Sequence, residues 1–367
     1  MLSKRSLLRR AIAVAGGGLI ASGTAGAAPI GGSSSTAQRH RQNGYDASAV
    51  VDAETTVTAS VERPVLNVVG LPGPVGNALT DIRQQYSSVS LEDIQRVSAS
   101  AAIDGETITG GCAIATGSFD SQAIGAQARE HGLTDVESTD DEHRMEAGPH
   151  QQRATGTGSS RSITPTTREP ETVDRFAAAD SPYAIGVDDS TLYVGYDHGE
   201  TDARTHVDTA LEMNADRQSR PTQSGTVAGA NYGSLPSLLS GHAVAYASLG
   251  SDTRRSLCSR LTDAPDAFKS AIRAASAAGV ALQAGSDRSR LRYGIVADPN
   301  RVSAETVRNI VTEATTGSQS LESDGIYRSG NTIVFDATVE TDALWASHGQ
   351  FLGIEDTDNR QESTHVL

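Results

Sequence analysis

Residues 97–120 decide the fold: Val97-Ser-Ala-Ser-Ala-Ala-Ile-Asp-Gly-Glu-Thr-Ile-Thr-Gly-Gly-Cys-Ala-Ile-Ala-Thr-Gly-Ser-Phe-Asp120. Two apolar runs flank Asp104-Gly105, and an Asp-Gly pair between such runs is typical of a β-hairpin with a tight turn. Asp120 stands directly before apolar residues at helical spacing, so we expect it to cap a helix that ends near Gly132. The stretch therefore predicts two antiparallel strands followed by a helix that covers them.

The same order of elements recurs downstream. A second hairpin is predicted at 183–195, Tyr-Ala-Ile-Gly-Val-Asp-Asp-Ser-Thr-Leu-Tyr-Val-Gly, followed by a helix from about Asp202 to Met213. The C-terminal half predicts a strand at 242–248, a hairpin that pairs 280–284 with 291–297, and a hairpin at 326–337 with its turn at Ser329-Gly-Asn331. It also predicts helices capped by Asp263 (ending at Gly279) and by Ser303. Each half has the pattern helix, strand, strand, helix, strand, strand, helix, which indicates an internal repeat. We expect an α+β fold with two similar lobes of antiparallel sheet covered by helices.

Composition divides the chain around these lobes. Stretches rich in Gly, Ser, Thr and charged residues, without helical or strand periodicity, predict a disordered lead-in and an internal disordered linker. The expected divisions are a signal peptide at 1–28, a disordered lead-in at 29–60, a first lobe at 61–220 with a disordered insertion at 138–175, a second lobe at 221–354, and a flexible tail at 355–367.

The first 28 residues predict export. Lys4, Arg5, Arg9 and Arg10 precede a Gly- and Ala-rich apolar run, and Ala25-Gly26-Ala27 fits an Ala-x-Ala cleavage site. The adjacent arginines favour the twin-arginine route. A membrane-spanning helix is the alternative, but glycines dilute the apolar run below the ~20 strongly apolar residues that a span needs. We therefore expect a secreted protein, with the signal either cleaved or retained as an anchor.

The charge balance indicates adaptation to high salt. The chain has 45 acidic and 30 basic residues, a net charge of −15, and aromatic residues make up only 4% of it. Removing the four basic residues of 1–28 leaves 26 basic against 45 acidic residues, a net charge of −19. Lys4 and Lys269 are the two lysines. Multimolar salt screens such dense like charge over about 3 Å. The acidic surface argues against nucleic-acid binding and against attraction to an anionic membrane.

The cysteines and motifs exclude several classes of enzyme. Cys112 and Cys258 are either one disulfide, which an exported protein permits, or two separate buried residues. The sequence contains no Gly-x-Ser-x-Gly, no His-Glu-x-x-His and no phosphate-binding Gly-x-x-x-x-Gly-Lys. Familiar serine hydrolases, zinc peptidases and nucleotide-binding proteins are therefore not indicated, and we expect no cofactor.

One cluster is a candidate metal site. If a helix begins near Glu200, Asp202 and His206 lie four residues apart on one face, and His198 precedes them in the turn. The alternative is an acidic helix start with His206 on the solvated face. Arg288, Arg290 and Arg292 alternate along a predicted strand, which indicates either an anion site or a solvated edge.

The chain resembles a family of uncharacterised secreted proteins of halophilic archaea, which carry a twin-arginine signal. The shared features are the export signal, a strand that ends in Ala115-Thr-Gly-Ser-Phe-Asp120 before a helix, and the 183–195 hairpin. The resemblance implies the compartment and the fold, and it brings no catalytic residues.

Two functions are compatible with these observations. The first is a non-enzymatic exported binding or envelope-associated module, whose partner the sequence does not name. The alternative is a secreted hydrolase or metal-dependent enzyme that uses the Asp197–His206 cluster, with Asp202 and His206 as ligands or as an acid–base pair.

Overall fold

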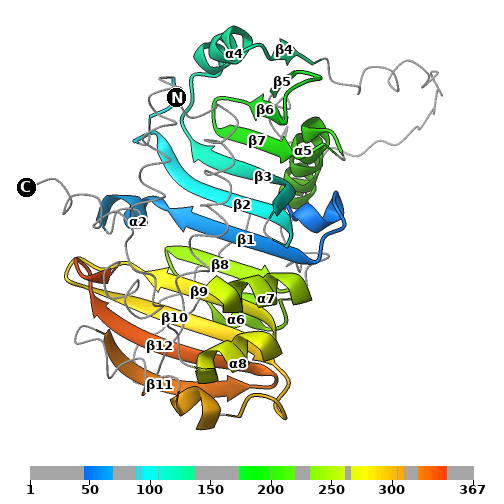
Figure 1. Ribbon diagram of the computed structural model, residues 1–367. Helices are drawn as coiled ribbons and strands as arrows, with labels where there is room; N and C mark the ends of the chain where they lie inside the picture. The colour runs from blue at the N-terminus through cyan, green and yellow to red at the C-terminus, as the bar shows by residue number, and fades with distance from the viewer. Residues whose placement is uncertain are drawn as a thin grey trace, which may run out of the picture.

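The computed structural model describes residues 45–68, 88–90, 92–105, 107–136, 173–199, 201–219, 232–260, 266–303, 305–309, 312 and 321–344. The described strands form one sheet of 12 strands in the order β11-β12-β10-β9-β8-β1-β2-β3-β7-β6-β5-β4. All neighbouring strands are antiparallel. Figure 1 shows this continuous sheet, with helices packed beside it. The predicted α+β class, mostly antiparallel sheet with a few helices, is confirmed.

The bounds of the elements are as follows. The strands are β1 Thr55–Glu62, β2 Ile94–Asp104, β3 Thr107–Gly117, β4 Thr134–Asp135, β5 Asp174–Ala177, β6 Tyr183–Val187, β7 Thr191–Asp197, β8 Ala243–Ser248, β9 Ala275–Gln283, β10 Arg288–Ala297, β11 Leu321–Ser329 and β12 Thr332–Glu340. The helices are η2 Ala47–Ala49, α2 Arg63–Val68, α4 Ser121–Glu130, α5 Ala203–Ser219, α6 Leu235–Leu238, α7 Ser251–Arg260 and α8 Asp266–Ala274.

The hairpins expected from the sequence are present. β2 and β3 pair across a turn at Gly105, whose φ of 58° is a left-handed value that glycine adopts readily. β6 pairs with β7, β9 with β10 and β11 with β12. The cap of α4 is also as predicted, because Asp120 Oδ1 accepts the backbone N–H of Ala123 at 2.9 Å. Local turn and cap chemistry therefore fixes these elements.

Two segments differ from the prediction. β1 occupies residues 55–62, which corrects the disordered lead-in expected at 29–60. Its Thr- and Ser-rich composition resembles a linker, yet these side chains are buried at the centre of the sheet. The helix expected to extend to Gly279 ends at Ala274, and β9 starts at Ala275. Pairing with β8 overrides the intrinsic helical preference of the alanines there.

β1 joins the two halves of the sheet. It pairs with β2 along one edge and with β8 along the other, so Ala59 lies between Ala99 and Ala245. On either side of this junction the strand order repeats: β1-β2-β3-β7-β6 in one direction and β8-β9-β10-β12-β11 in the other. The boundary expected between two lobes is thus crossed by a continuous ladder of strand pairs.

Hydrophobic clusters cover both faces of this sheet. On one face, α8 and α7 pack over the C-terminal half through Phe268, Ile272 and Leu257, and α4 packs over the N-terminal half through Ile124. On the other face, which we call the α5 face, α5 packs through Val207 and α6 through Leu235. Because both faces are covered, the central strands are rich in small residues rather than alternating between apolar and charged ones.

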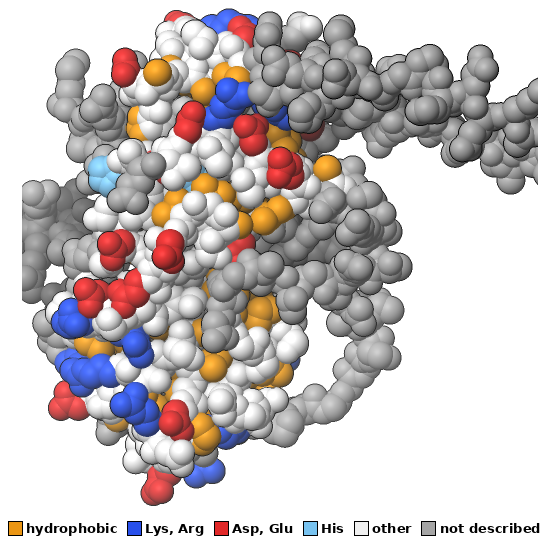
Figure 2. Space-filling view, turned by 90° about the vertical axis from the view of Figure 1, so that its right-hand side faces the viewer, with side chains coloured by type: hydrophobic (Ala, Val, Ile, Leu, Met, Phe, Trp, Pro, Cys, Tyr) orange, Lys and Arg blue, Asp and Glu red, His pale blue; other side chains and the backbone are white. Residues whose placement is uncertain are grey.

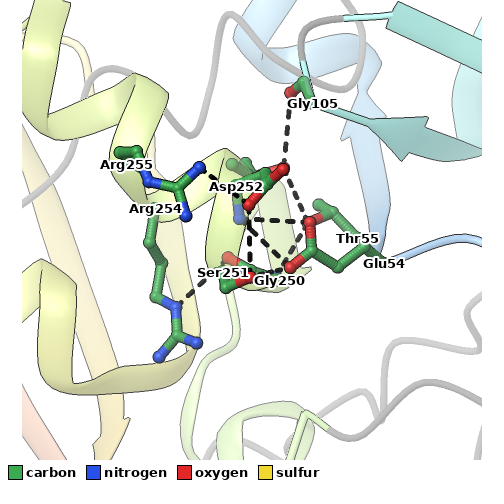
Figure 3. A network of polar contacts seen from close by, with 9 residues as sticks. Glu54, Thr55, Gly105, Gly250, Ser251, Asp252, Arg254 and Arg255 are labelled. Atoms are coloured by element: carbon green, nitrogen blue, oxygen red, sulfur yellow. Dashed lines mark hydrogen bonds and ion pairs between the residues drawn. The ribbon is translucent and has the colours of Figure 1, made fainter.

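A polar network fastens the junction at one end (Figure 3). Glu54 precedes β1, and its carboxylate accepts the backbone N–H groups of Ser251 and Asp252 at the start of α7. The Thr55 hydroxyl accepts the N–H of Gly250 at 2.8 Å and bonds to the Thr253 hydroxyl at 2.9 Å. A carboxylate at a helix N-terminus satisfies free N–H groups and complements the helix dipole. The network therefore ties β1 to α7, the helix that follows β8.

Several predicted segments lie outside the described residues: the signal at 1–28, most of the insertion at 138–175 and the tail at 355–367. Asp174 and Arg175, placed in that insertion, belong to β5. Among the described helices, none combines the length and the apolar character that crossing a membrane requires.

Candidate functional site

A hollow opens on the α5 face above β1, β2 and β3. Its cavity volume is about 10 Å³, about the room that one water molecule needs. Four hydroxyl side chains line it, and we call them the hydroxyl grid: Thr58 and Ser60 on β1, and Ser98 and Ser100 on β2. Thr58 lies opposite Ser100 and Ser60 lies opposite Ser98, so the four form two cross-strand pairs.

Alternation along the strands explains why the hydroxyls gather there. Residues two apart on a strand point to the same face. Thr58 and Ser60 therefore share the α5 face, while Ala59 between them belongs to the cluster on the opposite face. Tyr45, Cys112 and Ile114 complete the walls of the hollow. Short side chains on the central strands leave the space that larger ones would fill.

One pair of the grid is held in a network. The Thr58 hydroxyl donates to Ser100 Oγ at 3.2 Å and bonds to the Tyr232 hydroxyl at 2.9 Å. Ser100 Oγ also accepts the backbone N–H of Ala47 at 3.0 Å, which fixes η2 beside the hollow. The other pair is less engaged. Ser98 is 6% exposed, and its hydroxyl reaches Ile114 O only at 3.5 Å, beyond the usual O–H···O range.

A buried chain of polar side chains supports one wall. Tyr45 Oη lies 2.5 Å from His206 Nδ1, and His206 Nε2 lies 3.3 Å from Asp197 Oδ2. The exposed fractions are 3% for Tyr45, 0% for His206 and 2% for Asp197. A carboxylate only accepts hydrogen bonds, so Nε2 carries the proton toward Asp197 and Nδ1 accepts from the Tyr45 hydroxyl. Both imidazole nitrogens are thereby satisfied.

Burial keeps the side chains of His206 and Tyr45 uncharged. Burial lowers the pKa of His206, an effect that the bond to Asp197 partly opposes. Burial, aided by Cys112, Asp46 and Asp197, raises the pKa of Tyr45 well above its ordinary value. Burial also raises the pKa of the Cys112 thiol to about 12. At neutral pH the hollow therefore presents a neutral phenol and a neutral thiol, and neither is an activated nucleophile.

The backbone positions Asp197 and His206. Asp197 ends β7, and its Oδ1 accepts the N–H groups of Gly199 and Thr201 at 2.7 and 3.0 Å in the turn before α5. The imidazole of His206 packs directly against β3 at Gly110. α5 thus begins from a fixed turn and delivers His206 into the interior.

The predicted metal cluster does not come together in this geometry. His206 is buried, whereas His198 and Asp202 are exposed. Asp202 accepts the N–H of Arg204 at 3.0 Å at the start of α5. Among the described residues, no group of three or more His, Cys, Asp or Glu side chains is arranged to hold a metal ion. The structure also differs from the alternative that places His206 on the solvated face.

The other candidates are also resolved. Cys112 and Cys258 are free thiols, so the open question of a disulfide is answered. Arg292 pairs with Asp336, with an Nη2–Oδ2 distance of 2.9 Å, and Arg288 pairs with Glu322. These two arginines are bound to carboxylates of neighbouring strands rather than forming an anion site.

Sequence reasoning missed the hydroxyl grid and Tyr45. Tyr45, Thr58 and Ser60 fell in the predicted lead-in, whereas Ser98 and Ser100 fell in the predicted hairpin, beside which no third strand was expected. The alternating hydroxyl and apolar residues of Thr56-Val-Thr-Ala-Ser-Val61 were the available signal for a strand with one hydroxyl-bearing face.

The chain matches no family model and no curated relative. Solved structures of TP0453 resemble it at 8% identity. Crystal form III has a TM-score of 0.45 and covers 83% of this chain and 95% of that chain. Crystal form IV has a TM-score of 0.40, with coverages of 80% and 92%. At this level of similarity they say nothing about the site.

Proposed function

We propose that this chain is an exported, salt-adapted binding module, with its contact surface at the mouth of the hollow above β1, β2 and β3. The observation that carries the proposal is the hollow itself, lined by the hydroxyl grid at the junction of two repeated halves. Export and salt adaptation rest on the 1–28 segment and on the acidic composition. Figure 2 shows acidic and basic side chains scattered among many uncharged ones on the face in view.

The repeated strand order supports a duplicated origin, in which two similar lobes have merged through β1 and β8. A ligand site at such a junction is formed by strands next to the fusion point. This agrees with the general preference of binding sites for boundaries between structural units.

An enzyme that uses Asp197 and His206 is less well supported. General acid–base chemistry requires a side chain within hydrogen-bond reach of a substrate. His206 has no exposed surface, and Tyr45 and Asp197 occupy its two ring nitrogens. We infer that this chain of side chains positions Tyr45 in the wall of the hollow.

The test is native mass spectrometry of the protein recovered from the culture medium of its host in native salt. We expect a mass that lacks the first 28 residues and carries a non-covalent adduct. The Ser60→Leu variant, which fills the hollow, is expected to lose the adduct, and the Ser248→Leu variant to keep it. Ser248 is a matched control, because it lies on the same face, opposite Thr56, and does not line the hollow. A stoichiometric metal, or no adduct at all, contradicts the proposal.

A further inference from the structure

We infer that residues 45–51, which we call the strap, are released from the sheet in acid while the sheet itself stays folded. The latch is the hydrogen bond of 2.5 Å from the Tyr45 hydroxyl to Nδ1 of His206. The release goes beyond the proposed function and does not depend on it, because no partner takes part. It moves Tyr45, which forms part of the wall of the hollow.

The strap lies on the α5 face over β2 and β3. Tyr45, Ala47 and Val51 are buried there. Backbone bonds close turns within the strap, such as the bond from Val51 N–H to Ala47 O at 3.0 Å. The Tyr45 hydroxyl and the Ala47 N–H reach out of it, to His206 and to Ser100 Oγ. A segment held by turns and side chains opens at a lower free energy than a strand that is paired on both sides.

The chain can bend between the strap and β1. Asp52 is exposed and Ala53 is half-buried. From Glu54 onward the chain is fastened to α7 by the network of Figure 3. The strap can therefore swing about residues 52 and 53 while β1 keeps its place in the sheet.

A proton on His206 conflicts with the closed strap. In the neutral ring, Nε2–H faces Asp197 and Nδ1 accepts from Tyr45. A protonated ring carries a hydrogen on both nitrogens, so Nδ1 no longer accepts and the phenol proton needs another acceptor. Tyr45 is 3% exposed, so water does not supply that acceptor while the strap is closed. A buried hydroxyl that loses its acceptor costs free energy, which the open strap recovers by exposing the phenol.

The groups around this bond come from several elements, and together they keep the ring neutral. Burial lowers the pKa of His206, and the bond to Asp197 at the end of β7 opposes this in part. The Asp197 carboxylate also accepts two backbone N–H groups of the turn before α5. On the strap, Asp46 is buried and accepts hydrogen bonds within the strap. On β3, the pKa of the Cys112 thiol is raised to about 12, and beside the first turn of α5 Asp202 is exposed.

The experiment is hydrogen–deuterium exchange with mass spectrometry on the full mature protein in native salt. Exchange is followed from about pH 8 to about pH 5, with rates corrected for the effect of pH on the exchange chemistry. Peptides that span the strap are compared with peptides of β3, which lies beneath it. We expect the protection of the strap to fall by up to about tenfold per pH unit below 6.5, and the protection of β3 to stay unchanged.

Two variants test the latch. His206→Gln removes the titrating group, so the protection of the strap should no longer depend on pH. Tyr45→Phe removes the latch, so at neutral pH the protection of the strap should already be about tenfold lower. Tyr327→Phe is the matched control, because it removes the same atom from an exposed ring and should change nothing in the strap. Circular dichroism of each variant establishes that it is folded.

Four results overturn the inference. The strap and β3 lose protection together, the protection of the strap does not change with pH, His206→Gln keeps the fall, or Tyr45→Phe protects the strap as well as Tyr327→Phe does. A missing adduct in the mass spectrum contradicts the binding module and leaves these exchange results as they are.

Discussion

The imidazole of His206 and the backbone of Gly110 are in such close contact that a Cβ at position 110 would lie 2.5 Å from Nε2. α5 therefore packs on β3 only because residue 110 has no side chain. This contact sets the depth of His206, and through it the positions of Asp197 and Tyr45.

Gly110→Ala should therefore destabilise the fold. The added methyl group displaces the imidazole from Asp197, and we expect a loss of about 1–3 kcal/mol in the free energy of unfolding, as for other overpacked sites. Chemical denaturation measures it. In the His206→Ala background the same substitution should cost much less, because the clashing ring is absent. Equal losses in both backgrounds would contradict the contact.

Tyr45→Phe removes the hydroxyl that donates a hydrogen bond to His206 Nδ1. A buried nitrogen without its donor costs about 1–3 kcal/mol of folding free energy. Tyr327→Phe is the matched control, because Tyr327 is 42% exposed and the substitution removes the same atom. A loss from Tyr45→Phe no larger than from Tyr327→Phe would show that the bond to His206 contributes nothing.

The buried His206 predicts a pH dependence of stability. Its pKa is lowered below the ordinary 6.5, so in acid the unfolded chain takes up a proton that the folded chain does not. The stabilisation is complete above pH 6.5 and declines as the pH falls below that value toward the folded-state pKa. Unfolding measured from about pH 8 to about pH 5 should show this decline, and His206→Gln should flatten it. A profile that stays equally steep in His206→Gln would contradict the assignment to this side chain.

Glu54→Gln tests the fastening of β1 to α7. The bonds to Ser251 and Asp252 hold the pKa of Glu54 below its ordinary 4.5, so its stabilisation is present above that value and lost as the pH falls through the folded-state pKa. At neutral pH and low salt we expect a loss of about 0.3–1 kcal/mol, the usual effect of a charge at a helix N-terminus. The loss should shrink in multimolar salt. Glu92→Gln is the control, because Glu92 is exposed.

Removing salt tests the proposed adaptation. The mature chain would carry a net charge of −19, from 26 basic and 45 acidic residues, and dilute buffer no longer screens their repulsion. We expect the thermal unfolding midpoint to fall steeply as the salt concentration is lowered. An unchanged midpoint in dilute buffer would show that the acidic composition has another cause.

Local sequence signals predicted most of the strands, but they did not predict which strands pair when the residues lie far apart in the sequence. The Asp104-Gly105 turn and the Asp120 cap act over a few residues, so the pattern identified β2, β3 and α4. β1 was missed because its Thr- and Ser-rich composition resembles a linker, although its hydroxyl and apolar residues alternate. Asp197 and His206 both lay within the predicted cluster. Tyr45, which bonds to His206 in the structure, lies 161 residues away from it, and no spacing rule connects the two residues.

The central place of β1 has a consequence for how the chain is made. Thr55 and Thr253 are in contact although 198 residues separate them. While the chain is being synthesised, the N-terminal half has an open strand edge until the residues of β8 and α7 emerge, so this half cannot complete its hydrogen bonding by itself. Contacts between such distant residues slow folding. Under the export in the folded state that we propose, the chain has to wait at least until the residues of β8 and α7 are available.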